Sequence, residues 1–221
     1  MTASRPFVVA IDGPAASGKG TLARRLAERF TLAHLDSGRL YRATALLVLE
    51  AGADPADPGA AQAAAHRIDP PLLADPRLSD ERITRASAIV AAIPAVRAAL
   101  LQRQHDFAAQ PPKPARGAVV DGRDIGTVVC PDAAVKLFVT ASIEARAERR
   151  VKELRERGAT AIYGDVLRDM KERDARDSLR RVAPLAAAPD AVIIDTTRLD
   201  ADQVFVRAAD IITRALATHG R

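Results

Sequence analysis

The sequence predicts an α/β domain in which a five-stranded parallel sheet carries helices on both faces. Five short runs rich in Val, Ile, Leu and Phe are typical of strands buried on both sides, as in parallel sheets. Segments with apolar residues three or four positions apart lie between these runs, and strands that alternate with helices are typical of a wound parallel sheet. A chain of 221 residues is long enough for one such domain with a full core.

The first half of the chain supplies two strands and then becomes helical. In order, we expect a strand at 7–11, a helix from Gly18 with Leu22, Leu26 and Phe30 on one face, a strand at 32–35, and a helix capped by Asp36 or Ser37 and ended by Gly52. Proline and glycine then predict a loop at 52–60 and leave at most a weak insert at 68–80. A helical pattern resumes at about 81, breaks before Pro94 and continues to 107, and residues 110–116 form a linker.

The second half supplies three strands and three helices. In order, we expect strands at 118–120 and 135–139, a helix capped by Ser142 with Ile143, Ala147, Val151 and Leu154 as its apolar stripe and Gly158 at its end, a charged helix at 165–177, and a strand at 191–195. A last helix starts at Asp200, which has the pattern of a capping box with Gln203. Its inward residues are expected to be Val204, Ala208, Ile211 and Ala215.

Composition argues against several classes of protein. Aromatic residues make up 3% of the chain and there is no Trp, which argues against a base-stacking platform for single-stranded nucleic acid. The net charge of +5 favours polyanionic partners. Of the 33 basic residues, 28 are arginines, whose planar guanidinium group binds phosphate better than the ammonium group of lysine. A general preference of the source organism for arginine would give the same count. A single cysteine, Cys130, permits no intrachain disulfide and makes a cysteine-based metal site implausible. The four histidines, at 34, 66, 105 and 219, lack the spacing of metal ligands.

The N-terminal stretch turns polar soon after a short apolar run, so it does not have the pattern of a signal peptide. No stretch approaches the roughly 20 apolar residues that are needed to span a bilayer. We therefore expect a cytoplasmic protein without a membrane partner.

A phosphate-binding loop is expected directly after the first strand. GPAASGKGT, residues 13–21, fits the pattern G-x-x-x-x-G-K between a predicted strand and a predicted helix, the context that makes this motif credible. Glycines let backbone N–H groups converge on phosphate oxygens, the helix N-terminus adds a positive dipole end, and Lys19 reaches the β- and γ-phosphates. The predicted ATP contacts are Gly13, Pro14, Ala15, Ala16, Ser17, Gly18, Lys19, Gly20 and Thr21. The alternative is a glycine-rich turn that binds nothing.

Details of this loop narrow the class of protein. Gly20 follows the lysine, and the hydroxyl comes one position later, at Thr21. This spacing argues against a hydroxyl that binds Mg²⁺ directly, as in GTPases. The ending GKGT resembles that of nucleoside-monophosphate kinases. The guanine-reading tetrapeptide N-K-x-D does not occur, which argues against a GTPase switch. We therefore expect a nucleoside triphosphate as donor and a separate acceptor.

Two further segments are candidates for the acceptor site, because both follow predicted strands and ligands of α/β sheets gather at the carboxyl ends of strands. The first is LDSGRLYR, residues 35–42, whose Asp-Ser-Gly turn starts a helix and offers a second helix N-terminus for an anion. Arg39 and Arg42 flank this turn. A routine helix cap with solvated arginines is the alternative.

The second segment is VVDGRDIGTVVCPD, residues 119–132. Asp121 ends the third strand, where an acid can hold Mg²⁺ directly or through water, and Arg123 would point at the phosphates. Asp124 can only accept hydrogen bonds. Cytosine presents an N4 amino donor to such an acceptor, whereas uracil presents an oxygen that a carboxylate repels. Asp124 is thus a candidate base reader, or alternatively a turn acid paired with Arg123.

Four segments in this order resemble bacterial cytidylate kinases: GPAASGKGT, LDSGRLYR, DGRDIGTVV and KERDARDSLRRVAPL (171–185), of which DGRD-x-GT is the most diagnostic. The resemblance runs from about residue 8 to residue 215. It implies a P-loop kinase fold, ATP as the phosphoryl donor, Mg²⁺ held by Asp121 through water, and a monomer that acts on CMP and dCMP rather than on nucleic acid. It also implies one domain over 1–221, with a core at 5–36, 115–141 and 185–221, a monophosphate-binding part at 37–110 and a mobile helical lid at 142–180.

The resemblance implies roles for single residues as well. Lys19 and Arg123 are the expected catalytic residues, which stabilise charge. The residues that match the family's monophosphate-binding positions are Ser37, Arg42 and Arg123, and Tyr41 belongs to the same substrate site. The residues that match the pyrimidine-reading positions are Arg97, Asp124 and Arg180. Arg173 and Asp177 match the positions that hold the sugar. The attacking group is a phosphate oxygen that is largely ionised at neutral pH, so no general base is needed.

Two departures from the family pattern concern the acceptor part. Residues 68–80 are too short and too rich in proline for the family's small three-stranded insert. A serine that touches the base in the family lies near Pro94, where this chain offers Ser87, one position off, or Ala88. Both departures bear on the selectivity among CMP, dCMP and UMP.

The charged residues of the lid have a plainer interpretation. Most of Arg146, Glu148, Arg149, Arg150, Glu153, Arg155, Glu156 and Arg157 are expected to form a solvated face laced with ion pairs. Arg173, Asp177 and Arg180 differ, because spacings of four and three place them on one side of a helix.

Two other functions stay open at this point. Another P-loop kinase, for UMP, AMP or shikimate, would share the phosphate loop but would not need an acid at position 124. A basic nucleic-acid-binding ATPase would need aromatic residues and a continuous basic patch, and the scarcity of aromatic residues argues against it.

Overall fold

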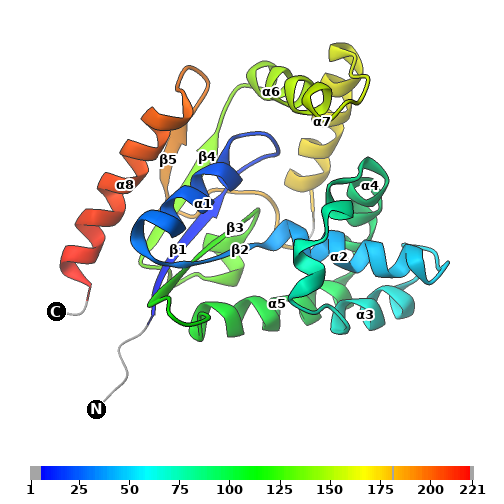
Figure 1. Ribbon diagram of the computed structural model, residues 1–221, viewed down its shortest axis with the longest axis horizontal. Helices are drawn as coiled ribbons and strands as arrows, with labels where there is room; N and C mark the ends of the chain where they lie inside the picture. Colours follow the sequence, from blue (N-terminus) through cyan, green and yellow to red (C-terminus); the bar gives the residue numbers. More distant parts are fainter. Residues whose placement is uncertain (1–5, 181, 220–221) are drawn as a thin grey trace. The chain divides into compact units, whose positions relative to one another are not determined.

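The computed structural model describes residues 6–180 and 182–219, and five strands of this part of the chain form one open sheet (Figure 1). The strands are β1 (Phe7–Asp12), β2 (Ala33–Asp36), β3 (Gly117–Gly122), β4 (Val135–Thr140) and β5 (Val192–Asp195), in the order β2-β3-β1-β4-β5. The central strand β1 pairs in parallel with β3 on one side and β4 on the other. The predicted α/β class and five-stranded parallel sheet are confirmed.

The chain divides into two compact units. The first unit comprises the residues up to 34 and from 108 onward, and the second unit comprises residues 35–107. Residue 5 and residues 220–221, which belong to the predicted core, lie outside the described residues, as does Arg181 of the segment 171–185.

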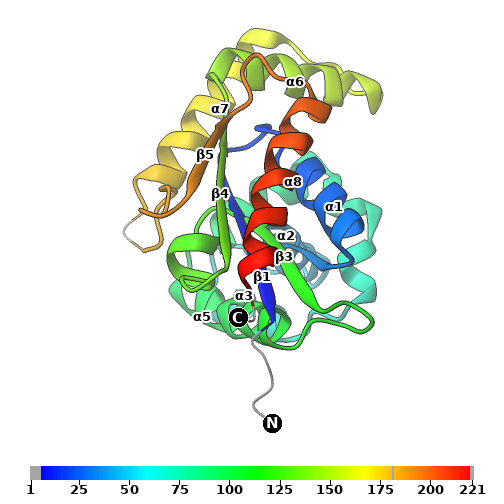
Figure 2. The same cartoon turned by 90° about the vertical axis from the view of Figure 1, so that its left-hand side faces the viewer.

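Among its described residues, the first unit combines most of the sheet with four helices and a short turn. Its elements besides strands are α1 (Lys19–Phe30), the π-helical turn η3 (Ile125–Val129), α6 (Ile143–Glu156), α7 (Tyr163–Ser178) and α8 (Ala201–Thr218). Helices α1 and α8 run side by side along the sheet (Figure 2). Side chains alternate along a strand, so the odd-numbered residues of β1 join one buried core with Leu22 and Leu26 of α1 and Ile212 of α8. Asp12 and the other even-numbered residues of β1 lie on the opposite face of the sheet.

Helix ends in the first unit follow the predicted caps. Asp200 accepts hydrogen bonds from the N–H groups of Asp202 and Gln203, and the Gln203 side chain accepts from the N–H of Asp200, which confirms the capping box. Ser142 caps α6, as predicted. The inward face of α8 is turned slightly from the predicted one, because Ile212 is fully buried and Ile211 only packs at the edge of the core.

The second unit is helical. It consists of α2 (Ser37–Glu50), α3 (Pro58–His66), the 3₁₀ helices η1 (Pro71–Ala74) and η2 (Pro76–Ser79), α4 (Glu81–Val90), and α5 (Pro94–Ala109), whose last two residues belong to the first unit. The predicted loop at 52–60 is wrong from Pro58 onward, since Asp57 caps α3 and Pro58 takes a first-turn position that needs no N–H. Residues 68–80, all of them described, contain two short 3₁₀ helices and no strand, as expected. Within the described ranges no single helix is long and apolar enough to cross a membrane. Among these residues, only the pair α4 and α5, which is bent by 101°, has the length and composition of a possible membrane span.

Candidate active site

The phosphate loop lies between β1 and α1, and the backbone explains its glycines. Gly13 has a φ of 150°, and a side chain there would collide with the carbonyl oxygen of Val139 in β4. Gly18 is the N-cap of α1, with a φ of 91°, and caps the helix with no side chain; no acid lies in the first turn either. The first amides of α1 are therefore not occupied by a capping side chain, which is the arrangement in which helix N-termini bind anions.

Lys19 and Ser17 line this loop from within. The Lys19 Nζ donates to the carbonyl oxygen of Pro14 at 3.2 Å, so the side chain lies over the loop rather than extending into solvent. The side chain of Ser17 is fully buried, and its Oγ has no hydrogen-bond partner among the described residues. A buried hydroxyl without a partner costs free energy, so its place inside the loop fits a site that a ligand completes.

Asp121 stands at the end of β3 beside the phosphate loop. Its side chain is 4% exposed, and its Oδ1 lies 2.7 Å from Nε2 of His34 on β2. Its Oδ2 lies 3.9 Å from the place that a Cβ at Gly20 would occupy, so this oxygen faces the start of α1. His34 was not singled out from the sequence. The contact joins residues 87 positions apart, and no local pattern announces it.

The surroundings of Asp121 suit Mg²⁺ that is held mainly by other ligands. In the described part of the chain, no three His, Cys, Asp or Glu side chains come together as a metal cage. Mg²⁺ commonly takes one or two protein carboxylates and completes its shell with phosphate oxygens and water. One carboxylate beside a phosphate loop is the donor set that this mode of binding requires.

Arg123 and Asp177 form an ion pair between the end of β3 and α7. The Arg123 Nε donates to Asp177 Oδ2 at 2.9 Å, and the Arg180 guanidinium donates to the other oxygen of the same carboxylate. The carboxylate is 7% exposed, and the Arg123 side chain 15%. Two guanidinium groups thus share one buried acid. Helix α7 ends at Ser178, so the expectation that Arg180 shares a helix face with Arg173 and Asp177 is wrong; Arg180 reaches Asp177 from the segment that follows the helix.

The charge state of Asp177 follows from this arrangement. Burial alone would raise the pKa of the carboxyl group. The charges of Arg123 and Arg180, the hydrogen bond from Arg123 and the charge of Arg173 more than offset burial and hold the pKa below its ordinary value. Asp177 therefore stays ionised at neutral pH, and Arg173 is close enough to act on it.

Asp124 is buried at the start of η3, and a second acid supports the turn. The Asp12 carboxylate, 3% exposed at the end of β1, accepts the N–H of Ile125 at 2.8 Å and the N–H of Gly126 at 2.7 Å. Burial raises the pKa of Asp12 to about 6, although the two N–H bonds act against burial. The sequence did not identify Asp12 as a site residue, since its partners lie 113 and 114 positions away.

In the second unit, Asp36 organises the segment 35–42. Its Oδ1 accepts the N–H of Arg39 at 3.1 Å and so caps α2, and its Oδ2 lies 2.9 Å from Nη2 of Arg42. Ser37 is buried at the first position of α2. The Arg39 guanidinium donates to the carbonyl oxygens of Leu73 and Asp75, so it is tied to η1 and η2 rather than solvated.

Tyr41 and Arg97 lie together in the second unit. The Arg97 guanidinium carbon is 5.8 Å from the centre of the Tyr41 ring, within the range of a cation–π contact. Ser87 is buried in α4, and its hydroxyl donates to the carbonyl oxygen of Thr84 at 2.7 Å. Of the two candidates for the family's base-contacting serine, Ser87 thus already uses its hydroxyl proton within its own helix.

Two arginines of α6 do not belong to a solvated face. Arg146 is 5% exposed, and it donates to the carbonyl oxygens of Ala141 and Ala15 and pairs with Asp174 of α7 at 2.6 Å. Arg149 donates to Oγ1 of Thr196 at 2.9 Å, and that hydroxyl in turn donates to the carbonyl oxygen of Ser17. For these two arginines the interpretation as part of a solvated, ion-paired face is wrong, because their side chains reach back to the loops at the strand ends.

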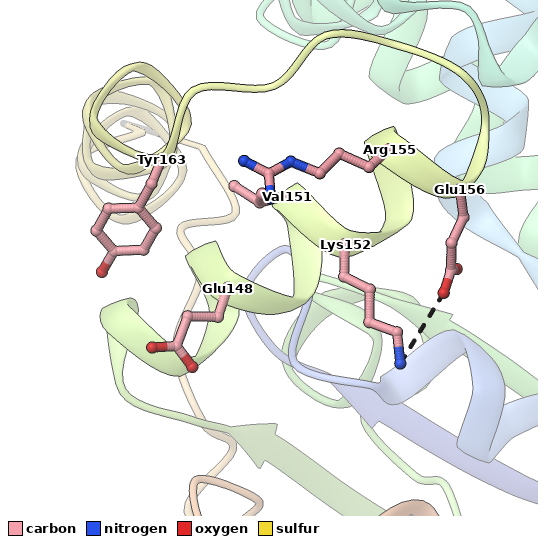
Figure 3. Close-up of a pocket in the computed structure, with 6 residues that line it drawn as sticks. All are labelled: Glu148, Val151, Lys152, Arg155, Glu156 and Tyr163. Carbon is pink, nitrogen blue, oxygen red and sulfur yellow. Dashed lines mark ion pairs between the residues drawn. The ribbon is translucent and has the colours of Figure 1, made fainter.

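The remaining charged residues of α6 match the expected solvated face laced with ion pairs. Ion pairs join Glu153 to Arg150 and Arg157, and Lys152 to Glu156. A cavity of about 610 Å³ lies on this face, lined by Glu148, Val151, Lys152, Arg155, Glu156 and, from α7, Tyr163 (Figure 3). It contains none of the predicted site residues, so its size does not make it the candidate site.

A comparison of the sequence with known families finds one match. The sequence model of cytidylate kinase matches residues 9–214. The chain belongs to the cytidylate kinase family. A cytidylate kinase of Rhodospirillum rubrum is 60% identical over 206 residues, which are 93% of this chain and 97% of that protein. A cytidylate kinase of Paramagnetospirillum magneticum is 58% identical over 205 residues, with the same coverage of both chains.

Two solved structures are similar to this chain in fold. A putative kinase from Chloroflexus aurantiacus superposes with a TM-score of 0.51 at 14% identity and covers 98% of both chains. The protein TT1252 from Thermus thermophilus superposes with a TM-score of 0.50 at 20% identity and covers 96% of this chain and 99% of its own. At these identities the similarity supports the fold alone.

The predicted site residues belong to both units. The first unit holds the phosphate loop Gly13–Thr21 with Asp121, Arg123, Asp124, Arg173, Asp177 and Arg180. The second unit holds Ser37, Tyr41, Arg42 and Arg97. Within the first unit the structure brings Arg123, Asp177 and Arg180 into contact, and within the second it places Arg97 at Tyr41.

Asp12 is expected to make the folded protein less stable as the pH rises from about 4 to about 7. Its pKa of about 6 exceeds the ordinary value of 3.8, so the folded state keeps the proton over a range in which the unfolded chain has released it. This difference corresponds to about 2 kcal/mol of unfolding free energy between these pH values. Urea unfolding of the wild type and of Asp12→Asn at several pH values measures it. The wild-type value should fall relative to the variant by about this amount, and a difference that does not change with pH would contradict the assignment.

Proposed function

We propose that this chain transfers the γ-phosphoryl group of ATP to the phosphate of CMP and of dCMP, which gives CDP or dCDP and ADP. The observation that carries the proposal is the match to proteins named cytidylate kinase over nearly the whole length of both chains. The buried acid at position 124 supports it, since an acceptor-only group suits the amino group of cytosine.

The donor half of the proposed site is the phosphate loop. The amides at the start of α1 and the ammonium group of Lys19 would bind the phosphates of ATP, and Asp121 would hold Mg²⁺ through a water molecule. When bound, Mg²⁺ would neutralise charge on the phosphate oxygens. His34 would keep one carboxylate oxygen of Asp121 occupied while the other faces Gly20.

The acceptor half combines residues of both units. Ser37, Arg42 and Arg123 would bind the phosphate of the acceptor, with Tyr41 in the same site, and Arg173 and Asp177 would hold its sugar. Arg97, Asp124 and Arg180 would read the base. The ion pairs of Asp177 with Arg123 and Arg180 support this grouping, because three side chains of the first unit that are proposed to hold the sugar, the phosphate and the base are in contact with one another.

The chemistry asks for positioning and for charge stabilisation. The attacking phosphate oxygen is largely ionised at neutral pH, so no side chain has to remove a proton. Lys19 and Arg123 would stabilise the charge that develops on the transferred group. Residues 142–180 would act as a mobile lid that keeps water from the phosphoryl group, with 5–36, 115–141 and 185–221 as the core and 37–110 as the monophosphate-binding part of a single domain.

The proposal includes a monomeric enzyme that acts in the cytoplasm on small nucleotides, without a nucleic-acid or membrane partner. Every role above is filled by residues of one chain, so the reaction does not call for a second subunit.

An assay of ADP release with different acceptors tests the function. With ATP and Mg²⁺ present, CMP and dCMP should give the highest kcat/KM among CMP, dCMP, UMP, AMP and shikimate. The last three represent the competing interpretation as another P-loop kinase. If one of them is the best acceptor, the proposed acceptor is wrong, even though the phosphate loop would keep its function.

A further inference from the structure

Asp12, at the end of β1, makes two hydrogen bonds to residues that lie 113 and 114 positions away in the chain. Its two carboxylate oxygens accept the N–H groups of Ile125 and Gly126, the first two residues after Asp124. The register of the sheet places Asp12 opposite Gly122 of β3, so the acid reaches past the strand end to the following turn. An acid in this position acts as the N-cap of η3, although it comes from another strand.

The residue at the normal N-cap position is Asp124 itself. An aspartate at an N-cap usually binds the N–H groups two or three residues ahead with its own side chain. The Asp124 side chain makes no such bond. The amides at the start of this turn are bound by Asp12 instead, so the turn does not need the Asp124 carboxylate as its cap.

The peptide group that joins Asp124 to Ile125 is also held at its carbonyl oxygen. Its carbonyl oxygen accepts the N–H of Val128 at 2.9 Å and the N–H of Val129 at 3.1 Å. The peptide group between Asp124 and Ile125 is thus fixed at its carbonyl oxygen by η3 and at its N–H by Asp12. The position from which the Asp124 side chain starts is therefore defined by these contacts.

We infer that Asp12 is a positioning residue for acceptor selection, which caps η3 from β1 and thereby fixes Asp124 in the orientation that reads the base. The inference rests on the proposed function, because it assigns Asp12 a part in how Asp124 acts on CMP. It adds a residue that does not touch the base itself.

The chemistry at position 12 calls for an acid rather than a neutral isostere. A carboxylate has two acceptor oxygens, one for each N–H, whereas the amide of Asn has one acceptor and would turn N–H donors toward the second. Asp12 also directly precedes Gly13, where an added Cβ would collide with the carbonyl oxygen of Val139 in β4, so the chain packs closely against β4 at this point. One strand end therefore anchors both the phosphate loop and the turn that carries Asp124.

Two variants disturb this contact in different ways. Asp12→Asn removes one of the two acceptors. Gly126→Ala leaves Asp12 intact but adds a Cβ that would lie 3.4 Å from its Oδ2 and 3.2 Å from Cδ of Lys136, so the Asp12 contact, the Lys136 side chain or the turn has to give by a few tenths of an ångström. Asp132→Asn is the matched control, since Asp132 is an exposed acid in the next turn and lies outside the proposed site.

The measurement is the ratio of kcat/KM for CMP to kcat/KM for UMP, because a ratio within one protein sample does not depend on how much of it is folded. Asp12→Asn and Gly126→Ala should each lower this ratio by about five- to tenfold, and Asp132→Asn should leave it unchanged. In the Asp124→Ala background, Asp12→Asn should lower it no further, because Asp12 acts through Asp124. The amide proton resonances of Ile125 and Gly126 should move upfield in Asp12→Asn as the bonds to the carboxylate are lost.

The outcomes separate the inference from the function on which it rests. If wild-type protein does not prefer CMP, the proposed function fails. If Asp124→Ala lowers the ratio but neither Asp12→Asn nor Gly126→Ala does, the inference alone is overturned. The same holds if Asp12→Asn lowers the ratio equally with and without Asp124. Should Asp12→Asn fail to fold, Gly126→Ala carries the test alone.

Discussion

Replacing Lys19 with Met is expected to lower kcat for the phosphorylation of CMP by about 10²- to 10³-fold. The ammonium group lies over the phosphate loop, bonded to the Pro14 carbonyl, and it is the cation in this loop that can follow the transferred phosphoryl group. Methionine keeps the length of the side chain but removes the charge. Because charge grows on the phosphate oxygens during transfer, the loss should affect kcat more than the affinity for ATP.

Steady-state kinetics with saturating ATP and CMP, together with calorimetric titration of ATP, measures this split. Lys113→Met is the matched control: it removes the same charge from an exposed residue of the linker, and it should leave kcat unchanged. An unchanged kcat in Lys19→Met, or a loss confined to ATP affinity, would remove Lys19 from the catalytic role.

Replacing Asp124 with Ala is expected to lower the preference for CMP over UMP by about 10- to 100-fold. A hydrogen bond from the N4 amino group of cytosine to a buried carboxylate is charge-assisted, and the same carboxylate repels the O4 oxygen of uracil. Removing it weakens CMP binding and also lifts the penalty against UMP. Asp124→Asn keeps an acceptor and gains a donor, so it should favour UMP further.

The ratio of kcat/KM for the two acceptors measures this effect, with the affinity for ATP as the internal control. ATP affinity should stay near the wild-type value, because Asp124 follows the end of β3 rather than the phosphate loop. Asp132→Ala, an exposed acid in the same stretch of chain, should change neither quantity. An unchanged ratio in Asp124→Ala would remove Asp124 from the base-reading role.

Local features of the sequence were enough for the strands and for the phosphate loop. Strand β1, the glycines at positions 13 and 18 and the helix that follows form one continuous stretch, in which each residue constrains its neighbours. The capping box at Asp200 is local in the same sense. Helix α3 was missed because an Ala-rich segment has little apolar periodicity, although Asp57 and Pro58 carried a readable start signal.

Contacts between distant residues could not be predicted from the sequence. His34 and Asp121 meet only because β2 and β3 are neighbours in the sheet. Arg146 has the spacing of a solvated helical residue, yet it is buried because the loop at Ala15 and the acid at Asp174 are brought to it. Each of these contacts forms only in the assembled sheet, so helix periodicity and motif spacing do not predict them.

The collision that a side chain at Gly13 would make with β4 limits how proteins of this kind can diverge. Since Gly13 cannot be exchanged without separating β1 from β4, the preceding residue, Asp12, has a fixed place too. Under the proposed function, a change of acceptor base would therefore have to come from the base-reading side chains Arg97, Asp124 and Arg180, and not from a movement of this strand end.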